Sequence, residues 1–135
     1  MTAGYSGKPL VRKLGIVAGQ RVVAMQAPEH YEELLHPLPE GVEIVGEPEP
    51  ETALAHLFVI GRADLVRQLH RLEPCLAKNG MLWISWPKKS SKVVTDLTED
   101  RVREVGLAAG LVDVKVCAVD AIWSALKFVY RLKDR

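Results

Sequence analysis

Two almost uninterrupted apolar segments, residues 21–27 and 56–60, constrain the fold more than any other feature of this sequence. A strand with one face in water alternates apolar and polar residues, whereas a strand covered on both faces is apolar nearly throughout. Strands of the second kind belong to parallel sheets that have helices packed on each side. Residues 81–86 form a third such segment. The sequence therefore predicts an α/β fold.

Helical patterns separate the predicted strands. Pro28 is a favourable first helical residue, and the helix that follows it is expected to end near Pro37. A second helix is predicted from Arg62, with one stripe of leucines that reaches Leu76. A turn at residues 79–80, Asn-Gly, then leads into the strand over residues 81–86.

The remaining segments complete the pattern. Residues 42–45 suggest a short strand, and residues 46–51 (Gly-Glu-Pro-Glu-Pro-Glu) predict an acidic loop. A third helix is predicted to start at Asp96 or Thr98 and to run as far as Ala109, with acidic residues in its first turn.

The last two predicted strands, residues 112–117 and 126–130, must pair antiparallel, because the loop Asp120–Ser124 is too short for a crossover. The whole pattern predicts a doubly wound, mostly parallel six-stranded sheet of order 2-1-3-4-6-5, with helices on both faces and an antiparallel C-terminal hairpin. A chain of 135 residues fits one domain over residues 1–135, in which residues 1–13 form an N-terminal arm.

Charge and composition exclude several classes of function. Lys and Arg number 18, Asp and Glu number 17, and a net charge of +1 offers no field that would attract nucleic acid or a membrane surface. No segment has the length of a membrane span or the pattern of a signal peptide, so we expect a cytoplasmic protein. Cys75 and Cys117 form no Cys-x-x-Cys pair and are expected to be reduced core residues. The histidines lack metal-site spacing, so no metal is expected.

Three segments resemble parts of the class I methyltransferase fold. Residues 14–23 are similar to its lead into the first strand, residues 76–84 to a later helix-turn-strand, and residues 109–114 to the run into its penultimate parallel strand. The resemblance implies a Rossmann-like fold. Members of that family place a glycine-rich turn after the first strand, where the backbone approaches the cofactor.

That turn departs from the family pattern in this chain. It reads Gln26-Ala27-Pro28-Glu29-His30 and contains no glycine. Proline lacks a backbone N–H and fixes one dihedral angle where a close approach needs freedom. We therefore expect no cofactor, no binding of S-adenosylmethionine and no methyl transfer.

The whole chain more closely resembles a family of small bacterial proteins catalogued as a domain of unknown function. That resemblance implies a fold and carries no activity with it. The segments that support it are residues 3–7, 13–15, 86–89, 96–100, 110–120 and 123–124.

In an open α/β sheet, ligands bind beyond the carboxyl ends of the strands, where the strand order reverses. The predicted topology brings several polar segments to this edge. We expect them to form a ligand site without catalytic residues. Its candidate residues are His30, Arg62, Lys88, Lys89, Ser90, Asp120 and Trp123.

The loop over residues 88–92, Lys-Lys-Ser-Ser-Lys, carries the strongest local signal. Its three ammonium groups and two hydroxyls are donors suited to a phosphate or carboxylate, and Arg62 is expected to reach the same place. The alternative is a solvated loop in which Asp96 pairs with one of the lysines.

The segment Gly4-Tyr5-Ser6-Gly7-Lys8 is similar to two catalytic motifs and satisfies neither. A nucleophile elbow requires glycine where Lys8 stands, and a phosphate-binding loop requires Ser or Thr where Pro9 stands. We interpret the segment as part of the N-terminal arm.

Three functional interpretations follow. The first is a non-catalytic domain that binds a small anionic ligand or a protein partner at the carboxyl edge. The second is an enzyme acting on a phosphorylated or carboxylated small molecule, with His30 or Asp120 as acid or base and Lys88 or Lys89 as anion clamp. The third is a structural interaction module whose acidic loop, residues 46–51, meets a basic partner. Ligand identity and oligomeric state stay open.

Overall fold

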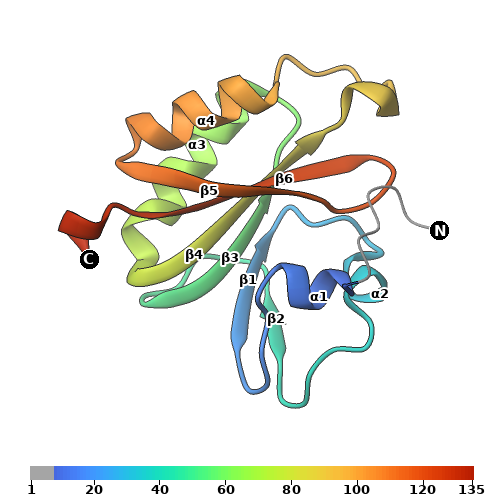
Figure 1. The fold of residues 1–135 in the computed structure, drawn as a ribbon, viewed down its shortest axis with the longest axis vertical. Helices are drawn as coiled ribbons and strands as arrows, with labels where there is room; N and C mark the ends of the chain where they lie inside the picture. Colours follow the sequence, from blue (N-terminus) through green and yellow to red (C-terminus); the bar gives the residue numbers. More distant parts are fainter. Residues whose placement is uncertain (1–7) are drawn as a thin grey trace.

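The computed structural model describes residues 8–135 and contains a six-stranded sheet of order β2-β1-β3-β4-β6-β5, as predicted (Figure 1). The first four strands in that order pair in parallel, and β6 runs antiparallel to β4 and β5. The strands are β1 Arg21–Met25, β2 Glu43–Val45, β3 Thr52–Phe58, β4 Leu76–Pro87, β5 Leu111–Ala118 and β6 Trp123–Tyr130.

Helices cover both faces of the sheet, because successive residues of each buried strand point to opposite sides. On β3, Ala55 and Leu57 face a cluster completed by α3 and α4, whereas Leu54 and Phe58 face a second cluster completed by α1 and α2. The helices are α1 Leu10–Lys13, α2 Tyr31–Leu35, α3 Arg62–Leu72 and α4 Glu99–Ala108, with 3-10 turns at Glu73–Cys75, Lys89–Ser91 and Leu132–Asp134. None of these helices is long and apolar enough to cross a membrane.

The junction between α3 and β4 differs from the prediction. Leu76 does not extend the helix but begins β4 and pairs with Thr52. Residues 79–80 lie inside the strand, where the register jumps, so the predicted turn is wrong. Gly80 is required there because a Cβ atom would fall 2.8 Å from the Thr52 carbonyl oxygen. Pro74 is expected to stop the helix near its end, and α3 does end at Leu72, directly before the 3-10 turn that contains Pro74.

Other helix boundaries and residue placements also differ from those predicted. Part of the predicted N-terminal arm folds as α1, whose Val11 is buried in the core. Helix α2 starts at Tyr31 instead of Pro28, although the Tyr31 N–H still donates to the Pro28 carbonyl oxygen at 3.0 Å. Cys75 and Cys117 are free, as expected, but only half-buried. Cys117 packs against the core cluster beneath α1 and α2, whereas Cys75 lies in neither core cluster.

A fully buried polar chain crosses the face of the sheet that α1 and α2 cover. His56 on β3 hydrogen-bonds through Nδ1 to the Tyr31 hydroxyl at 2.8 Å and through Nε2 to the Ser85 hydroxyl at 2.7 Å. Burial lowers the pKa of His56 to about 3 and raises the pKa of Tyr31 above its ordinary value. The ring is therefore neutral and fully hydrogen-bonded, and its role is to join α2, β3 and β4.

Candidate functional site

A cavity of about 290 Å³ opens at the carboxyl edge, where the sheet reverses its strand order between β1 and β3. This is the location that the doubly wound topology predicts for a ligand. The walls are largely apolar, and they come from the ends of β1 and β3, the start of α3 and the β5–β6 hairpin. The lining residues are Gln26, Pro28, Phe58, Val59, Ile60, Gly61, Asp64 and Trp123.

Gln26 bridges the reversal point. Its backbone adopts a left-handed conformation with φ of 58°, and its side-chain amide donates to the Phe58 carbonyl oxygen at 2.7 Å and to Asp64 Oδ2 at 2.9 Å. The hydrogen bond from Gln26 holds the pKa of Asp64 below its ordinary value. Sequence reasoning noted the missing glycines but not this amide bridge, which connects β1 to β3 and α3.

His30 and Asp120 meet at the same edge although 90 residues separate them. His30 Nε2 lies 3.2 Å from Asp120 Oδ2, and the other oxygen of Asp120 accepts the N–H groups of Ile122 and Trp123 at 2.8 Å each. Burial raises the pKa of Asp120, but the hydrogen bonds from Trp123, His30 and Ile122 outweigh burial and leave the pKa below its ordinary value. The carboxylate is thus charged and positions His30.

Lys88 is anchored to the hairpin by its backbone. Its N–H donates to the Ile122 carbonyl oxygen at 2.7 Å, and its residue is half-buried. Lys89 and Ser90 follow in the 3-10 turn Lys89–Ser91 and are exposed. The structure therefore places Lys88 against the hairpin and leaves Lys89, Ser90 and Lys92 exposed, whereas Ser91 is half-buried and donates to the Lys88 carbonyl oxygen.

Positive charges converge on Cys117 from three separate segments. Burial raises the pKa of the Cys117 thiol, while the charges of Lys13, Lys115 and Lys88 act in the opposite direction. Lys115 Nζ also lies 6.0 Å from the centre of the Trp83 ring. Lys13 and Lys115 are absent from the predicted site residues, because only the fold brings their charges close enough to act on Cys117.

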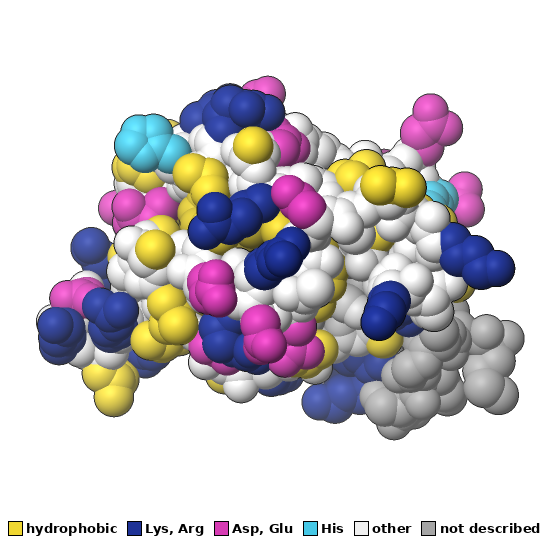
Figure 2. Space-filling model, turned by 90° about the horizontal axis from the view of Figure 1, so that it is seen from above, with side chains coloured by type: hydrophobic (Ala, Val, Ile, Leu, Met, Phe, Trp, Pro, Cys, Tyr) yellow, Lys and Arg dark blue, Asp and Glu magenta, His cyan; other side chains and the backbone are white. Residues whose placement is uncertain are grey.

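Away from this edge, basic and acidic side chains lie among one another on the surface. Seen from above, the side on which α4 lies shows basic and acidic side chains interspersed (Figure 2). The acidic loop over residues 46–51 is folded back on the protein, since Glu47 pairs with Arg71 and Glu49 with Arg21, each at 2.6 Å. The loop therefore offers a partner less free negative charge than its sequence suggests.

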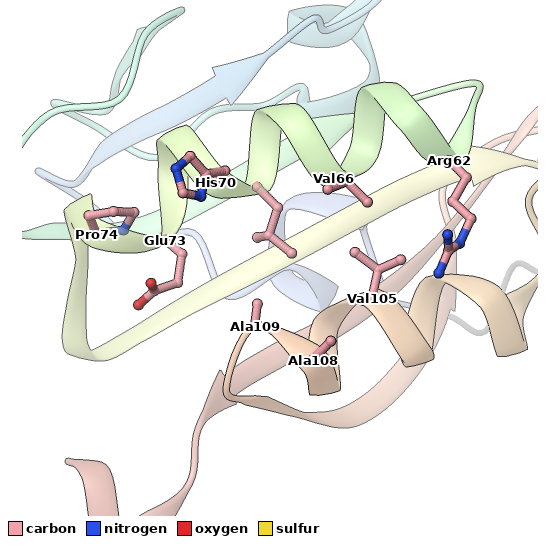
Figure 3. Close-up of a pocket in the computed structure, with 9 residues that line it drawn as sticks. Arg62, Val66, His70, Glu73, Pro74, Val105, Ala108 and Ala109 are labelled. Carbon is pink, nitrogen blue, oxygen red and sulfur yellow. The ribbon is translucent and has the colours of Figure 1, made fainter.

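Arg62 does not join the lysines. Its N–H donates to Asp96 Oδ1 at 2.8 Å, whereas its side chain extends into a groove between α3 and α4, on the other side of the sheet from α1 and α2 (Figure 3). Asp96 thus caps α3 from the loop before α4, and Thr98 caps α4 by accepting the Arg101 N–H. The alternative in which Asp96 holds a lysine finds no such ion pair within residues 8–135.

The sequence also predicts that no metal is bound and that the Gly-Tyr-Ser-Gly segment is part of an N-terminal arm. Among the described residues, no group of three or more His, Cys, Asp or Glu side chains could hold a metal ion. The segment Gly4-Tyr5-Ser6-Gly7 lies outside the described residues.

Several solved structures share this fold. The pyocyanin biosynthetic protein PhzM aligns with a TM-score of 0.66 at 12% identity, over 90% of this chain and 53% of that protein. A SAM-dependent methyltransferase from Aquifex aeolicus aligns with a TM-score of 0.63 at 10% identity, over 88% of this chain and 86% of that chain. Fibrillarin from Aeropyrum pernix, solved with S-adenosyl-L-methionine bound, aligns with a TM-score of 0.56 at 13% identity, over 90% and 72%.

The chain spans about half the length of PhzM. No protein-family model and no curated protein sequence matches it, so the resemblance to a small bacterial family stays a prediction. At identities of 10–13%, the alignments establish architecture and not activity. This chain has the α/β fold of the SAM-dependent methyltransferases.

Proposed function

We propose that this chain is a methyltransferase-like domain without methyl-transfer activity, which binds a small anionic ligand at the carboxyl edge of its sheet. The observation that carries the proposal is the arrangement at this edge, where the N–H of Lys88 holds its residue against the Ile122 carbonyl oxygen at 2.7 Å and Asp120 holds His30 at 3.2 Å. The charges of Lys88 and Lys115, which come from separate segments, both act on Cys117, and an anion held near them offsets their mutual repulsion. His30, Lys89, Ser90, Asp120 and Trp123 form the wider rim of the proposed site.

The first prediction is that anion binding depends on the converging lysines. Lys88→Ala and Lys115→Ala should each weaken binding of inorganic phosphate about tenfold, since each removes one charge-assisted contact. Isothermal titration calorimetry at low ionic strength measures the change. The melting temperature should shift little, because these side chains are half-buried or exposed and are not core residues.

Lys133→Ala is the matched control, since it removes the same charge from the exposed C-terminal 3-10 turn. Equal phosphate affinity in all three variants would contradict the proposed site. So would the absence of any phosphate binding by the unaltered protein at millimolar concentration.

The second prediction is that S-adenosylmethionine does not bind. The Gln26 side chain already bridges Phe58 and Asp64 at the reversal point, so a ligand there would have to break both hydrogen bonds. We expect no heat of binding with sub-millimolar S-adenosylmethionine, while a methyltransferase with a glycine-rich turn, measured alongside, binds it. A micromolar dissociation constant for the unaltered chain would show that the bridge opens and would favour methyl transfer.

An enzyme using the same edge is the second candidate, and the His30–Asp120 pair favours it. Asp120 holds Nε2 of His30, which leaves Nδ1 as the nitrogen that would exchange a proton with a phosphorylated or carboxylated substrate. His30→Gln separates the two functions. If the domain only binds, the variant retains most of its phosphate affinity and there is no turnover to lose. An enzyme would lose turnover completely.

A further inference from the structure

A second cavity, of about 310 Å³, lies between α3 and α4, on the opposite side of the sheet from the lysines. Figure 3 shows the two helices facing each other across it, with Val66 on α3 opposite Val105 and Ala108 on α4 and Ala109 directly after α4. Leu69 and Val105 are buried at its floor, whereas the Val66 side of the groove is open, with 48% of that residue exposed. The small alanines leave the space that a larger side chain would fill. We call this cavity the α3–α4 groove.

The two ends of the α3–α4 groove differ in charge. Arg62 extends from the first turn of α3 towards α4 at one end, and Glu73 and Pro74 lie at the other (Figure 3). Within residues 8–135, no acidic side chain forms an ion pair with the Arg62 guanidinium. Glu73, in contrast, accepts a hydrogen bond from the Tyr130 hydroxyl. One end of the groove therefore presents the Arg62 guanidinium, which forms no ion pair within the described residues. The other end presents the Glu73 carboxylate, which is bonded to Tyr130.

The geometry points to a binding site for a single-chain amphiphilic carboxylate in the α3–α4 groove. Its carboxylate binds the Arg62 guanidinium, whose planar fork matches a carboxylate in two hydrogen bonds. Its hydrocarbon chain lies along Val66, Leu69 and Val105 towards Pro74. The helical stretch from Arg62 to Glu73 is about 16 Å long at 1.5 Å per residue, which accommodates a medium-length chain.

The groove favours an anionic amphiphile over other small ligands on two grounds. A cationic amphiphile would meet Arg62 with like charge, and a short carboxylate would leave the apolar floor uncovered. Each methylene that the groove removes from water strengthens binding by roughly fourfold. Affinity should therefore rise from butyrate through octanoate to decanoate.

The test is calorimetric titration of the full chain with decanoate below its micelle concentration. Arg62→Gln should weaken binding about tenfold, because it removes the charge that pairs with the head group. Arg67→Gln is the matched control, since Arg67 lies on the same helix, carries the same charge and is not part of the groove. It should leave the affinity unchanged.

A second variant tests the apolar half of the site. Ala108→Leu fills the groove from an exposed position on α4 and should also weaken decanoate binding at least tenfold without lowering the melting temperature. Lys88→Ala should have no effect, which separates this site from the proposed anion site. Methyl NMR signals of Val66 and Val105 should move on titration of the unaltered protein. Equal binding of decanoate and dodecyltrimethylammonium, or an affinity indifferent to both Arg62→Gln and Ala108→Leu, would overturn the inference.

Discussion

The free energy of unfolding is expected to fall by about 1.4 kcal/mol for each pH unit below 6.5 on account of His56 alone. The pKa of His56 is about 3 in the folded protein against 6.5 in an unfolded chain, so the unfolded chain binds the proton more tightly. The stability that the neutral ring contributes is complete above pH 6.5 and is lost progressively as the pH falls towards 3. Denaturant unfolding between pH 7 and pH 4.5 measures this dependence.

The His56→Gln variant isolates this contribution. Glutamine can still accept a hydrogen bond from Tyr31 and donate one to Ser85, but it does not titrate. The carboxylates with lowered pKa, Glu49, Asp64 and Asp120, are present in both proteins, so their contribution cancels when the two pH profiles are compared. We expect the variant to show a pH profile flatter by about 3 kcal/mol between pH 7 and pH 4.5.

An independent readout covers the case in which the variant fails to fold. The ring nitrogens of His56 in the unaltered protein, followed by NMR, should stay in their neutral state down to pH 4.5. A ring that titrates near pH 6.5 in the folded protein would contradict the buried arrangement of Tyr31, His56 and Ser85.

Gly106→Ala is expected to destabilise the protein by about 3 kcal/mol. Gly106 is buried in α4, and a Cβ atom at this position would lie closer than 3.0 Å to three atoms of the fully buried Phe128 ring on β6. Helix propensity alone predicts the opposite sign, a gain of about 1 kcal/mol for alanine over glycine. The sign of the change in the free energy of unfolding, measured by chemical denaturation, therefore shows whether packing or helix propensity dominates.

A second substitution tests the cause of that loss. In Gly106→Ala with Phe128→Leu, the smaller side chain leaves room for the new methyl group. The double variant should be more stable than the sum of the two single effects predicts, by on the order of 1 kcal/mol or more. Additive effects would mean that the helix and β6 do not meet as the structure shows.

Much of the fold followed from short-range patterns. The strand predicted over residues 56–60 lies at Thr52–Phe58, so it begins four residues earlier and ends two residues earlier than predicted. It is covered on both faces, and such strands restrict the chain to a parallel sheet between two helical layers. The antiparallel pairing of the last two strands could be predicted because the loop expected over residues 120–124 is too short for a crossover, and β6, which begins inside that loop at Trp123, does lie beside β5. The prediction was wrong at Leu76. The helical spacing of the leucines placed this residue in the helix, but it pairs with Thr52 on β3 instead, and such long-range pairing has no signal in the local sequence.

The candidate site was partly predictable for the same reason. Topology alone brings His30 and Asp120 to one edge, and they do meet there. The direction in which each side chain points could not be predicted from the sequence. Arg62 starts at that edge through its backbone but extends from α3 towards α4. Lys115 and Cys117 share a face because they are two residues apart on β5, but the shift in pairing between Asp113 and Lys115 changes how these residues line up with β6. Such shifts have no local signature.

Chemical-shift mapping with inorganic phosphate tests the central claim most directly. If the carboxyl edge binds small anions, the amide signals of Lys88, Lys115 and Cys117 should move together and saturate. S-adenosylmethionine at the same concentration should leave the signals of Gln26 and Gly61 unchanged. Phosphate shifts that grow without saturation and spread equally to distant lysines would contradict anion binding at this edge. Saturable shifts at Gln26 and Gly61 with S-adenosylmethionine would replace the anion-binding account with a methyltransferase.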